Sequence, residues 1–423
     1  MSEIQDTTQA GQSQPSNVPT KKKRVNVRTP DVMAKVQAEV EQHYRSNIVE
    51  KLRARGVITI GNTTLRLAQQ FGFCYGVERA IDLAYAARRV FEDRNIYLIG
   101  EIIHNPEVNR QLKEMNIKNL IGPDRDASVE DLTEDDVVIV PAFGAMTEMM
   151  DAIKERGVTI IDTTCGDVMS VWRRVKSYAK EGLTSIIHGK SEHEETLATS
   201  SRAIGASGSG HYLVILTLED TDYVCEYIRN GGDKSDFLKR FEGAYSPGFD
   251  PDIHLDQLGV ANQTTMLKSE TEELQRRLAQ AIKDRDGDEV GEKKFKFFDT
   301  ICGATQERQD ALFEMLRHPM DMLLVVGGYN SSNTGHLVEI GERSLPSFFI
   351  RTASCLETLD QILHFDLHSQ EEKRSYVEKF KSEEHVTIGI TAGASCPNNL
   401  IEDTIVRVFE LRGISMEQIL GSE

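Results

Sequence analysis

Short apolar runs alternate with longer helical patterns along most of this 423-residue chain, starting at Ile58. Strand-length runs separated by helix-length segments are typical of α/β units, and they disfavour an all-α or an all-β fold. The length suffices for about two to four domains. The predicted strands cover residues 64–67, 96–99, 137–140, 158–161, 185–187, 212–216, 295–298, 323–326, 347–350 and 386–390.

Three regions differ from this pattern. Residues 1–30 are rich in Ser, Thr, Gln and Pro, which predicts a disordered arm in which Lys21–Arg24 form a solvated charge run. The pattern of residues 30–55 predicts a polar helical extension that packs on the body. Residues 229–256 contain several Gly, Pro and Asp, which predicts an inserted or mobile loop region. The other predicted helices cover residues 77–91, 170–180, 268–283, 306–316, 335–343 and 399–411.

Charge and composition exclude several classes of protein. The 67 acidic and 49 basic residues give a net charge of −18, which repels nucleic-acid backbones, so no nucleic-acid partner is expected. Because no apolar stretch reaches the roughly 18–20 residues of a membrane helix, no membrane partner is expected either. Six thinly spread cysteines and the lack of a secretory signal indicate a reducing compartment, and we predict a cytoplasmic location.

Three cysteines share one local context. Cys74, Cys165 and Cys302 each follow a predicted strand and precede a predicted helix, and the last two repeat the pattern D-T-x-C-G. A thiol just before a helix lies in the positive field of exposed N–H groups, which favours the thiolate, and thiolates are ligands of iron–sulfur clusters. The alternative, that each is a small buried residue in a tight turn, stays open. Cys225 and Cys355 lack this context and are interpreted as packing or surface residues.

Several strand ends carry polar residues suited to an anionic ligand. His104 follows a predicted strand, while His193 and Glu195 offer an imidazole donor and a carboxylic proton source two positions apart. The loops 327–334 and 391–397 combine small residues with hydroxyl and amide side chains, as phosphate-binding loops do. Because neither matches a P-loop or the GxGxxG pattern, nucleotide binding is not indicated.

These motifs together resemble the LytB (IspH) family of 4-hydroxy-3-methylbut-2-enyl diphosphate reductases. The resemblance covers about residues 60–415, and the extension before Ile58 together with residues 141–145 is similar to the cyanobacterial and plant branch. The segments that carry it, in this order, are residues 72–80, 103–106, 162–165, 193–196, 263–265, Cys302, 330–333 and 391–395.

The resemblance implies three α/β units arranged with pseudo-threefold symmetry around a central iron–sulfur cluster. It further implies a 4Fe-4S cluster with three cysteine ligands, Cys74, Cys165 and Cys302, and one open iron. The expected division of the chain is an N-terminal extension, 1–57; a first unit with Cys74, 58–163, on which segment 391–423 packs back; a second unit with Cys165, 164–300; and a third unit with Cys302, 301–390.

The implied reaction is the reductive dehydroxylation of (E)-4-hydroxy-3-methylbut-2-enyl diphosphate to isopentenyl and dimethylallyl diphosphate, the last step of the methylerythritol phosphate pathway of isoprene biosynthesis. Glu195 would supply a proton to the leaving hydroxyl, and Thr264 would relay or orient it. The electrons would come from a donor such as ferredoxin or flavodoxin. The implied substrate-binding residues are His104, His193, Thr264, Ser331, Ser332, Asn333 and Ser395.

One position departs from the family pattern, and two other functions stay open. Phe143 stands where many members have a diphosphate-binding histidine. The first alternative is an iron–sulfur-dependent dehydratase acting on a phosphorylated alcohol, which needs no net electrons. The second is a non-catalytic phosphate-binding module whose cysteines are structural.

Overall fold

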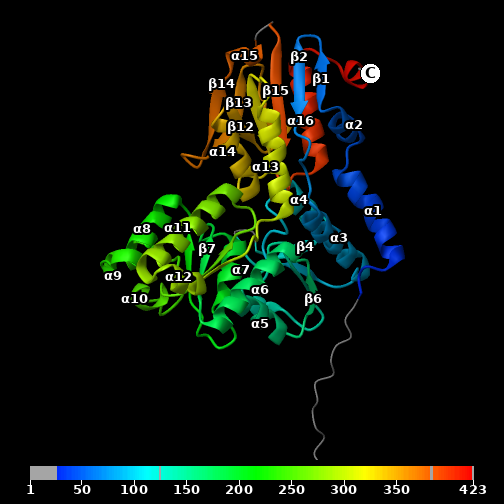
Figure 1. The fold of residues 1–423 in the computed structure, drawn as a ribbon. Helices are drawn as coiled ribbons and strands as arrows, with labels where there is room; N and C mark the ends of the chain where they lie inside the picture. Colours follow the sequence, from blue (N-terminus) through cyan, green and yellow to red (C-terminus); the bar gives the residue numbers. More distant parts are fainter. Residues whose placement is uncertain (1–25, 123–124, 382–383, 422–423) are drawn as a thin grey trace, which may run out of the picture.

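The computed structural model describes residues 26–122, 125–381 and 384–421. Lys21–Arg24 and most of the predicted disordered arm lie outside the described residues. The described chain forms three β-sheets with helices packed around them (Figure 1). The α/β class predicted from the alternating pattern is therefore confirmed.

In the largest sheet, the second strand of the described chain pairs with the last one. The second to fifth strands in its spatial order pair parallel, and the strands outside them pair antiparallel. In spatial order the seven strands are β1 (Val57–Ile60), β2 (Thr63–Leu67), β15 (Val386–Ala392), β11 (Met322–Val326), β12 (Ser347–Ile350), β13 (Gln361–Asp366) and β14 (Glu371–Tyr376).

The two smaller sheets have four strands each and are parallel throughout. One has the order β4 (Ile117–Asn119), β3 (Ile96–Leu98), β5 (Val137–Val140) and β6 (Thr159–Asp162). The other has the order β10 (Phe295–Phe297), β9 (Leu258–Asn262), β7 (Thr184–His188) and β8 (Tyr212–Ile215).

The N-terminal extension consists of two helices, α1 (Pro30–Tyr44) and α2 (Asn47–Arg55). Tyr44 is buried against the body, where its hydroxyl accepts a hydrogen bond from Tyr85 at 3.1 Å. No helix of the described ranges is long and apolar enough to cross a membrane. The further helices are α3 (Tyr75–Val90), α4 (Pro106–Glu114), α5 (Thr147–Glu155), α6 (Gly166–Glu181), α7 (Glu194–Ala203), α8 (Leu218–Asn230), α9 (Lys234–Arg240), α10 (Pro251–His254), α11 (Lys268–Asp286), α12 (Asp288–Lys294), α13 (Gly303–Leu316), α14 (Ser332–Glu342), α15 (Glu378–Lys381), α16 (Asn398–Leu411) and α17 (Met416–Gly421).

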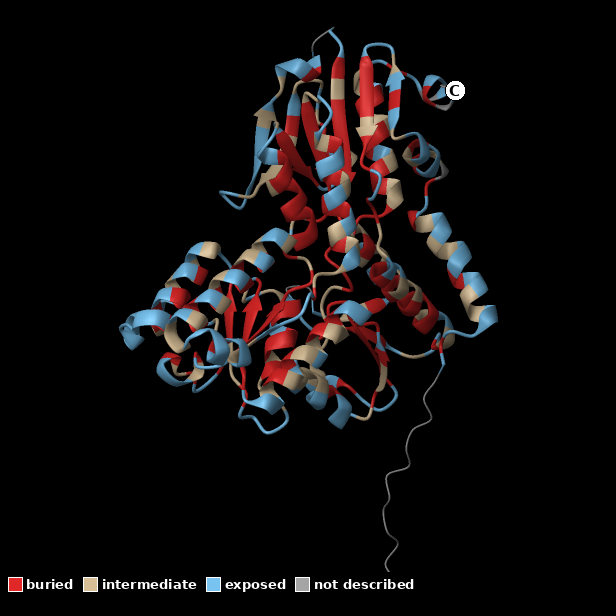
Figure 2. Cartoon of the chain, in the orientation of Figure 1, coloured by how far each residue is buried: buried red, intermediate tan, exposed pale blue. Residues whose placement is uncertain are grey.

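Apolar strands covered by helices hold each sheet in place, and Figure 2 shows the buried residues concentrated in the strands and on the inner faces of the helices. All residues of β11 are buried, as are Ile388 and Ile390 of the neighbouring β15. Parallel strands that are covered on both faces have continuous apolar sequences, which explains why the strands of this sheet centre could be predicted from the sequence. The rigid strands fix the loops that follow them.

One segment differs from its prediction. Residues 229–256, expected to be an inserted or mobile loop region, contain helices α9 and α10. Phe237, Phe241 and Phe249 are buried from this segment in the core beside β8 and α8. The helix begins after Asp233, whose side chain accepts hydrogen bonds from the N–H groups of the first turn. Helix capping and aromatic burial therefore outweigh the Gly- and Pro-rich composition.

The sheets also divide the chain differently from the expected units, whose limits stay a prediction. Strands β1 and β2, placed in the first unit, belong to the seven-stranded sheet, whereas β3 to β6 of the same unit form a separate sheet. Pairing of β2 with β15 joins segments from opposite ends of the chain, and local sequence patterns do not encode such a partner.

Candidate active site

Loops from all three sheets surround one central cavity of about 110 Å³. They follow the carboxyl ends of parallel strands, the usual position of ligands in α/β proteins. Every site residue predicted from the sequence lines this cavity: Cys74, Cys165, Cys302, His104, His193, Glu195, Thr264, Ser331, Ser332, Asn333 and Ser395.

Each sheet contributes one cysteine, and each cysteine is the N-cap of a helix. Cys74 links β2 to α3, Cys165 links β6 to α6, and Cys302 links β10 to α13. All three have extended backbone angles, and their carbonyl groups accept the first hydrogen bonds of the helices at 2.9–3.1 Å. The shared context found in the sequence is thus one local geometry used three times.

The thiols are free and lie close together. A Cβ atom built on Gly76 would lie 2.7 Å from Sγ of Cys165 and 3.8 Å from Sγ of Cys74, so a side chain at this position would fill the space between the two sulfurs. The three sulfurs are not all within 4.8 Å of one another, unlike the ligand atoms of a single ion. Such an arrangement fits a centre with several metal ions, in which each thiolate binds a different one.

The expected acidity of these thiols is wrong for two of the three. Burial raises the pKa of Cys165, and burial together with the side chain of Asp167 raises the pKa of Cys302 to about 12. Backbone N–H groups at the helix N-termini lower both pKa values, but the loss of water and the neighbouring negative charges outweigh them. A bound cation would act in the opposite direction and favour the thiolates, because metal ligation and deprotonation of cysteine are coupled.

Glu195 is a buried carboxyl group with one partner residue. It lies in the first turn of α7 and is 3 % exposed. Its two carboxylate oxygens accept hydrogen bonds from N–H and Oγ1 of Thr264, at 2.6 and 2.9 Å. Burial raises the pKa of Glu195 to about 7, although both hydrogen bonds act in the opposite direction. A carboxyl group with this pKa carries a proton in part of the population at neutral pH and can donate it.

His193 is held as a neutral imidazole. Its Nδ1 accepts a hydrogen bond from the N–H of Glu195 at 3.2 Å, which places the ring proton on Nε2. Burial lowers its pKa to about 3, and the charge of His104 acts in the same direction. The Nε2 atom is buried without a hydrogen-bond partner among the described residues. It is therefore a donor available to a ligand in the cavity.

The loops after β11 and β15 contribute further polar groups to the cavity. Asn333 accepts a hydrogen bond from the N–H of Ala394 at 2.8 Å through Oδ1 and leaves its Nδ2 buried without a partner in the described chain. Ser395 donates to the carbonyl of His104 at 3.2 Å. An amide donor without an acceptor is costly in a buried site unless a ligand satisfies it.

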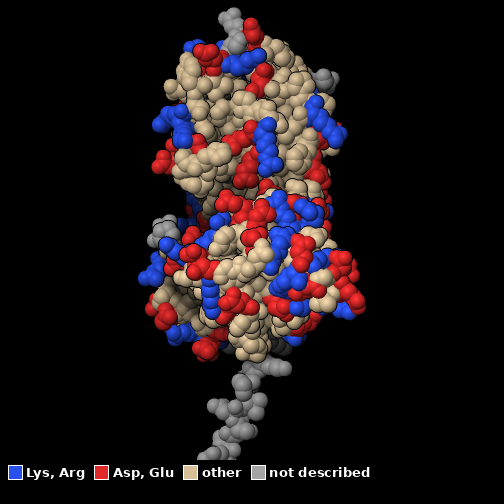
Figure 3. Space-filling model, turned by 60° about the vertical axis from the view of Figure 1, so that its left-hand side comes forward, with Lys and Arg blue, Asp and Glu red and all other residues tan. Residues whose placement is uncertain are grey.

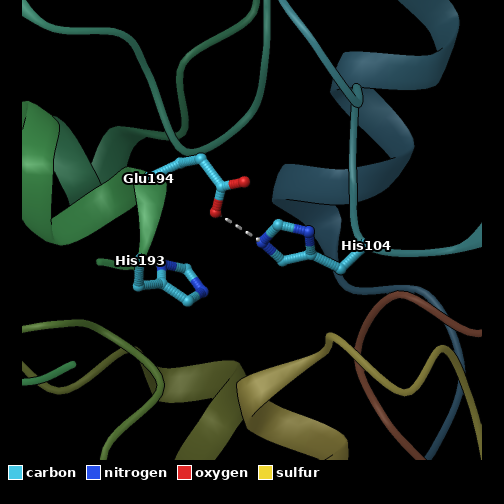
Figure 4. Close-up of side chains that lie close together, drawn as sticks. All are labelled: His104, His193 and Glu194. Carbon is cyan, nitrogen blue, oxygen red and sulfur yellow. Dashed lines mark ion pairs between the residues drawn. The ribbon is translucent and has the colours of Figure 1, made fainter. Parts of the chain in front are cut away.

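His104 stands between an aromatic ring and two carboxylates. It stacks on Phe143 with ring centroids 4.8 Å apart. Its Nδ1 lies 3.0 Å from Glu101, and its Nε2 lies 3.5 Å from the Glu194 carboxylate (Figure 4). Glu194 and His193 point toward the same ring from the start of α7. Phe143 therefore packs against His104, and the part that either ring plays in binding stays a prediction.

Three acidic residues at the cavity were missed from the sequence. Asp167 lines it beside Cys165 and Cys302, and Glu101 and Glu194 contact His104. The positions of two of them in the sequence could have indicated that they lie near the site. Asp167 follows the D-T-x-C-G repeat, and Glu194 lies between two predicted site residues. Glu101 has no such signal.

Comparison with known proteins places the chain in a family. The geometry is that of an α/β protein in which one central cavity brings together three thiols, a buried carboxyl group and polar donors without partners. The family profile described as "LytB protein" matches residues 65–409, and the chain belongs to this family.

Its relatives match over nearly their whole length. A 4-hydroxy-3-methylbut-2-enyl diphosphate reductase from Gloeobacter violaceus is 45% identical over 395 residues, 92% of this chain and 93% of that protein. One from Thermosynechococcus vestitus is 43% identical over 382 residues, 90% and 93% of the two chains. The solved structure of the E-1-hydroxy-2-methyl-but-2-enyl-4-diphosphate reductase from Plasmodium falciparum shares the fold, with a TM-score of 0.58 and 22% identity over 81% of this chain and 86% of that one.

Proposed function

We propose that this chain catalyses the reductive dehydroxylation of (E)-4-hydroxy-3-methylbut-2-enyl diphosphate to isopentenyl and dimethylallyl diphosphate, the last step of the methylerythritol phosphate pathway. The observation that carries the proposal is the meeting, in one cavity, of three convergent thiols, a buried carboxyl group and donors without partners. The names of the relatives agree with it.

Cys74, Cys165 and Cys302 are the residues that would hold a 4Fe-4S cluster. When bound, it would supply electrons and an open, Lewis-acidic iron toward the substrate hydroxyl. The spacing of the sulfurs and the raised pKa values of two thiols fit a centre of several cations. The three cysteines line the cavity from the loops that precede their helices, so a cluster that they hold would be accessible to a substrate bound there.

Glu195 would protonate the leaving hydroxyl, so that water rather than hydroxide departs. The reaction consumes two electrons and two protons, breaks the C–O bond and forms a C–H bond and water. The hydrogen bonds from Thr264 hold the Glu195 carboxyl in one orientation. Thr264 thereby orients the proton donor, and burial keeps the donor protonated near neutral pH.

The diphosphate would be bound by Nε2 of His193, Nδ2 of Asn333 and the hydroxyl groups of Ser332 and Ser395. The first two are buried donors without partners, and all four residues line the cavity. A site of neutral donors suits a chain of net charge −18, because local hydrogen bonds act where long-range charge opposes the anion. His104 and Ser331, which also line the cavity, complete this set. Nε2 of His104 has no hydrogen-bond partner among the described residues and lies 3.5 Å from the Glu194 carboxylate.

The electrons would come from a small redox protein such as ferredoxin or flavodoxin, and the enzyme would act in the cytoplasm. On the face drawn in Figure 3, the described acidic and basic side chains are interspersed over the lower part of the molecule, and the upper part carries fewer charges. A mixed surface of this kind suits a transient protein partner better than it suits a nucleic-acid backbone.

Anaerobic purification tests the proposal. The protein should be brown, contain about four iron and four sulfide per chain by the cluster stoichiometry, and consume two electrons from a chemical reductant for each diphosphate product. Turnover without electron consumption would establish the dehydratase alternative. A colourless, iron-free protein that still binds diphosphate would establish the non-catalytic module.

A further inference from the structure

Two arginines contact the loop that carries Cys74, and the mechanism above uses neither. Arg308, on α13 two turns after Cys302, is 3 % exposed. Its guanidinium donates to the carbonyl groups of Gly72 and Ala304, at 2.6 and 2.7 Å. A buried cation is therefore held by backbone oxygens beside two of the three cysteine loops.

The second arginine comes from the N-terminal extension. Arg53, in the last turn of α2, donates to the carbonyl of Phe71 at 3.1 Å and lies over the Phe71 ring at 4.2 Å. It also reaches Oδ1 of Asn398 at 3.4 Å. The extension thereby contacts the same loop as Arg308, one carbonyl group earlier.

The backbone of this loop is shaped for both contacts. Gly72 has φ +82°, and a Cβ atom there would lie 2.7 Å from Oδ1 of Asn398. Only glycine readily accepts this conformation and this close approach. The two consecutive carbonyl groups of Phe71 and Gly72 can thus each meet one arginine.

The charge of Arg308 lies close to the cysteine positions in the sequence and in space. Its two carbonyl acceptors, Gly72 and Ala304, are each two residues from a cysteine, Cys74 and Cys302 respectively. Arg53 and Arg308 also repel each other. An arginine keeps its charge even when buried, so the chain places a fixed positive charge next to two metal-ligand positions.

We propose that Arg308 is a positioning residue that raises the reduction potential of the cluster, and that Arg53 of the N-terminal extension assists it. The inference rests on the proposed function, because it presupposes the cluster. Reduction by one electron from a ferredoxin-type donor would add one negative charge to the cluster that the three cysteines hold, with no bond formed or broken. A fixed cation nearby in a region of low dielectric constant stabilises the reduced form.

Redox titration of the anaerobic protein, followed by visible absorption and electron paramagnetic resonance, tests this role. Arg308→Gln should disfavour reduction at least tenfold, which is about 59 mV toward lower potential for one electron. Arg308→Lys keeps the charge and should shift the potential by less than half as much. Arg53→Gln should shift it in the same direction by less than Arg308→Gln. The control is Arg317→Gln, an exposed arginine at the end of the same helix that pairs with Glu314.

The results separate this inference from the proposed function. A wild-type protein without a cluster overturns the function itself. A wild-type cluster with an unchanged potential in Arg308→Gln overturns only the role of the arginine, as does an equal shift in Arg317→Gln. If Arg308→Gln binds no iron, Arg53→Gln decides: a lowered potential supports the proposal, and an unchanged one overturns it.

Discussion

The cavity has two walls that differ in charge and in construction. The thiol wall consists of Cys74, Cys165 and Cys302, and the anion wall contains His193 and Asn333. The thiol wall repeats one strand–cysteine–helix geometry from three sheets, and burial raises the pKa of two of its thiols, Cys165 and Cys302. The anion wall is assembled from unlike loops, and it holds buried donors, in His193 and Asn333, that lack acceptors. Under the proposed function, the first wall would bind cations and the second an anion. The difference teaches that substitutions on each wall should change a different measured property, iron content on the first and substrate affinity on the second.

The largest effect is expected on the thiol wall. Cys74→Ser, Cys165→Ser and Cys302→Ser should each lose most iron and activity, because serine is a harder ligand that rarely deprotonates. Iron analysis after anaerobic purification measures this. Cys225→Ser is the matched control, since Cys225 is buried in a different core. Full iron content in all three variants would remove the cluster from this site.

The next largest effect concerns the proton donor between the walls. Glu195→Gln keeps the shape of the side chain but cannot supply a proton, so kcat should fall by about 10² to 10⁴. Iron content and substrate affinity should persist. Glu192→Gln, an exposed neighbour in the sequence, serves as the control. Near-normal turnover of the Glu195 variant would exclude this residue from the chemistry.

The pH dependence checks the same assignment without a change in structure. A pKa of about 7 means that Glu195 is protonated below pH 7 and ionised above it. As an acid it should support turnover at low pH, and kcat should fall about tenfold per unit as the pH rises above 7. Glu195→Gln should lack this step. A wild-type rate that rises through pH 7 would contradict the role of acid.

A smaller effect is expected on the anion wall. Asn333→Ala removes a donor to a charged group, worth about 1.5 to 3 kcal/mol, so substrate affinity should fall about ten- to a hundredfold. Phe143→Leu changes only packing against His104 and should weaken binding much less. Dissociation constants of both variants decide. A greater loss at Phe143 than at Asn333 would mean that the anion site is elsewhere.

The smallest effect is expected from a carboxylate beside the anion wall. Glu194 places a carboxylate 3.5 Å from Nε2 of His104, where a diphosphate would bind. Because Glu194 is half exposed, its influence is screened and amounts to about 1 kcal/mol or less. Glu194→Gln should tighten binding of inorganic pyrophosphate by up to about fivefold, and more at low salt than at high salt. Weaker binding in this variant would show that the carboxylate supports the site.

The sequence predicted what is local in this molecule. The turn from strand to helix around each cysteine spans only a few residues, so Cys74, Cys165 and Cys302 could be selected together, and the structure brings them to one cavity. Their roles, like those of the other site residues, stay predictions. Sequence reasoning failed on the acidity of Cys165 and Cys302, because burial and neighbouring charges depend on the tertiary structure.

Contacts between residues far apart in the sequence could not be predicted from it either. Nothing near Arg308 in the sequence indicates that it binds the carbonyl of Gly72, and nothing near β2 indicates that β15 is its neighbour. The buried Phe237 and Phe241 of residues 229–256 are spaced as one helix face, yet the composition of that segment outweighed the signal. Composition describes a segment, whereas burial depends on what packs against it.

The pairing of β2 with β15 has a consequence for the biosynthesis of the protein. The N–H of Cys74 donates to the carbonyl of Ala394, so the first cysteine is held by a segment that the ribosome makes long after Cys302. A growing chain can already expose Cys74, Cys165 and Cys302 while the loop around the first still lacks its support. We therefore expect iron to be inserted after translation, and truncated chains that lack β15 to be rejected at that step.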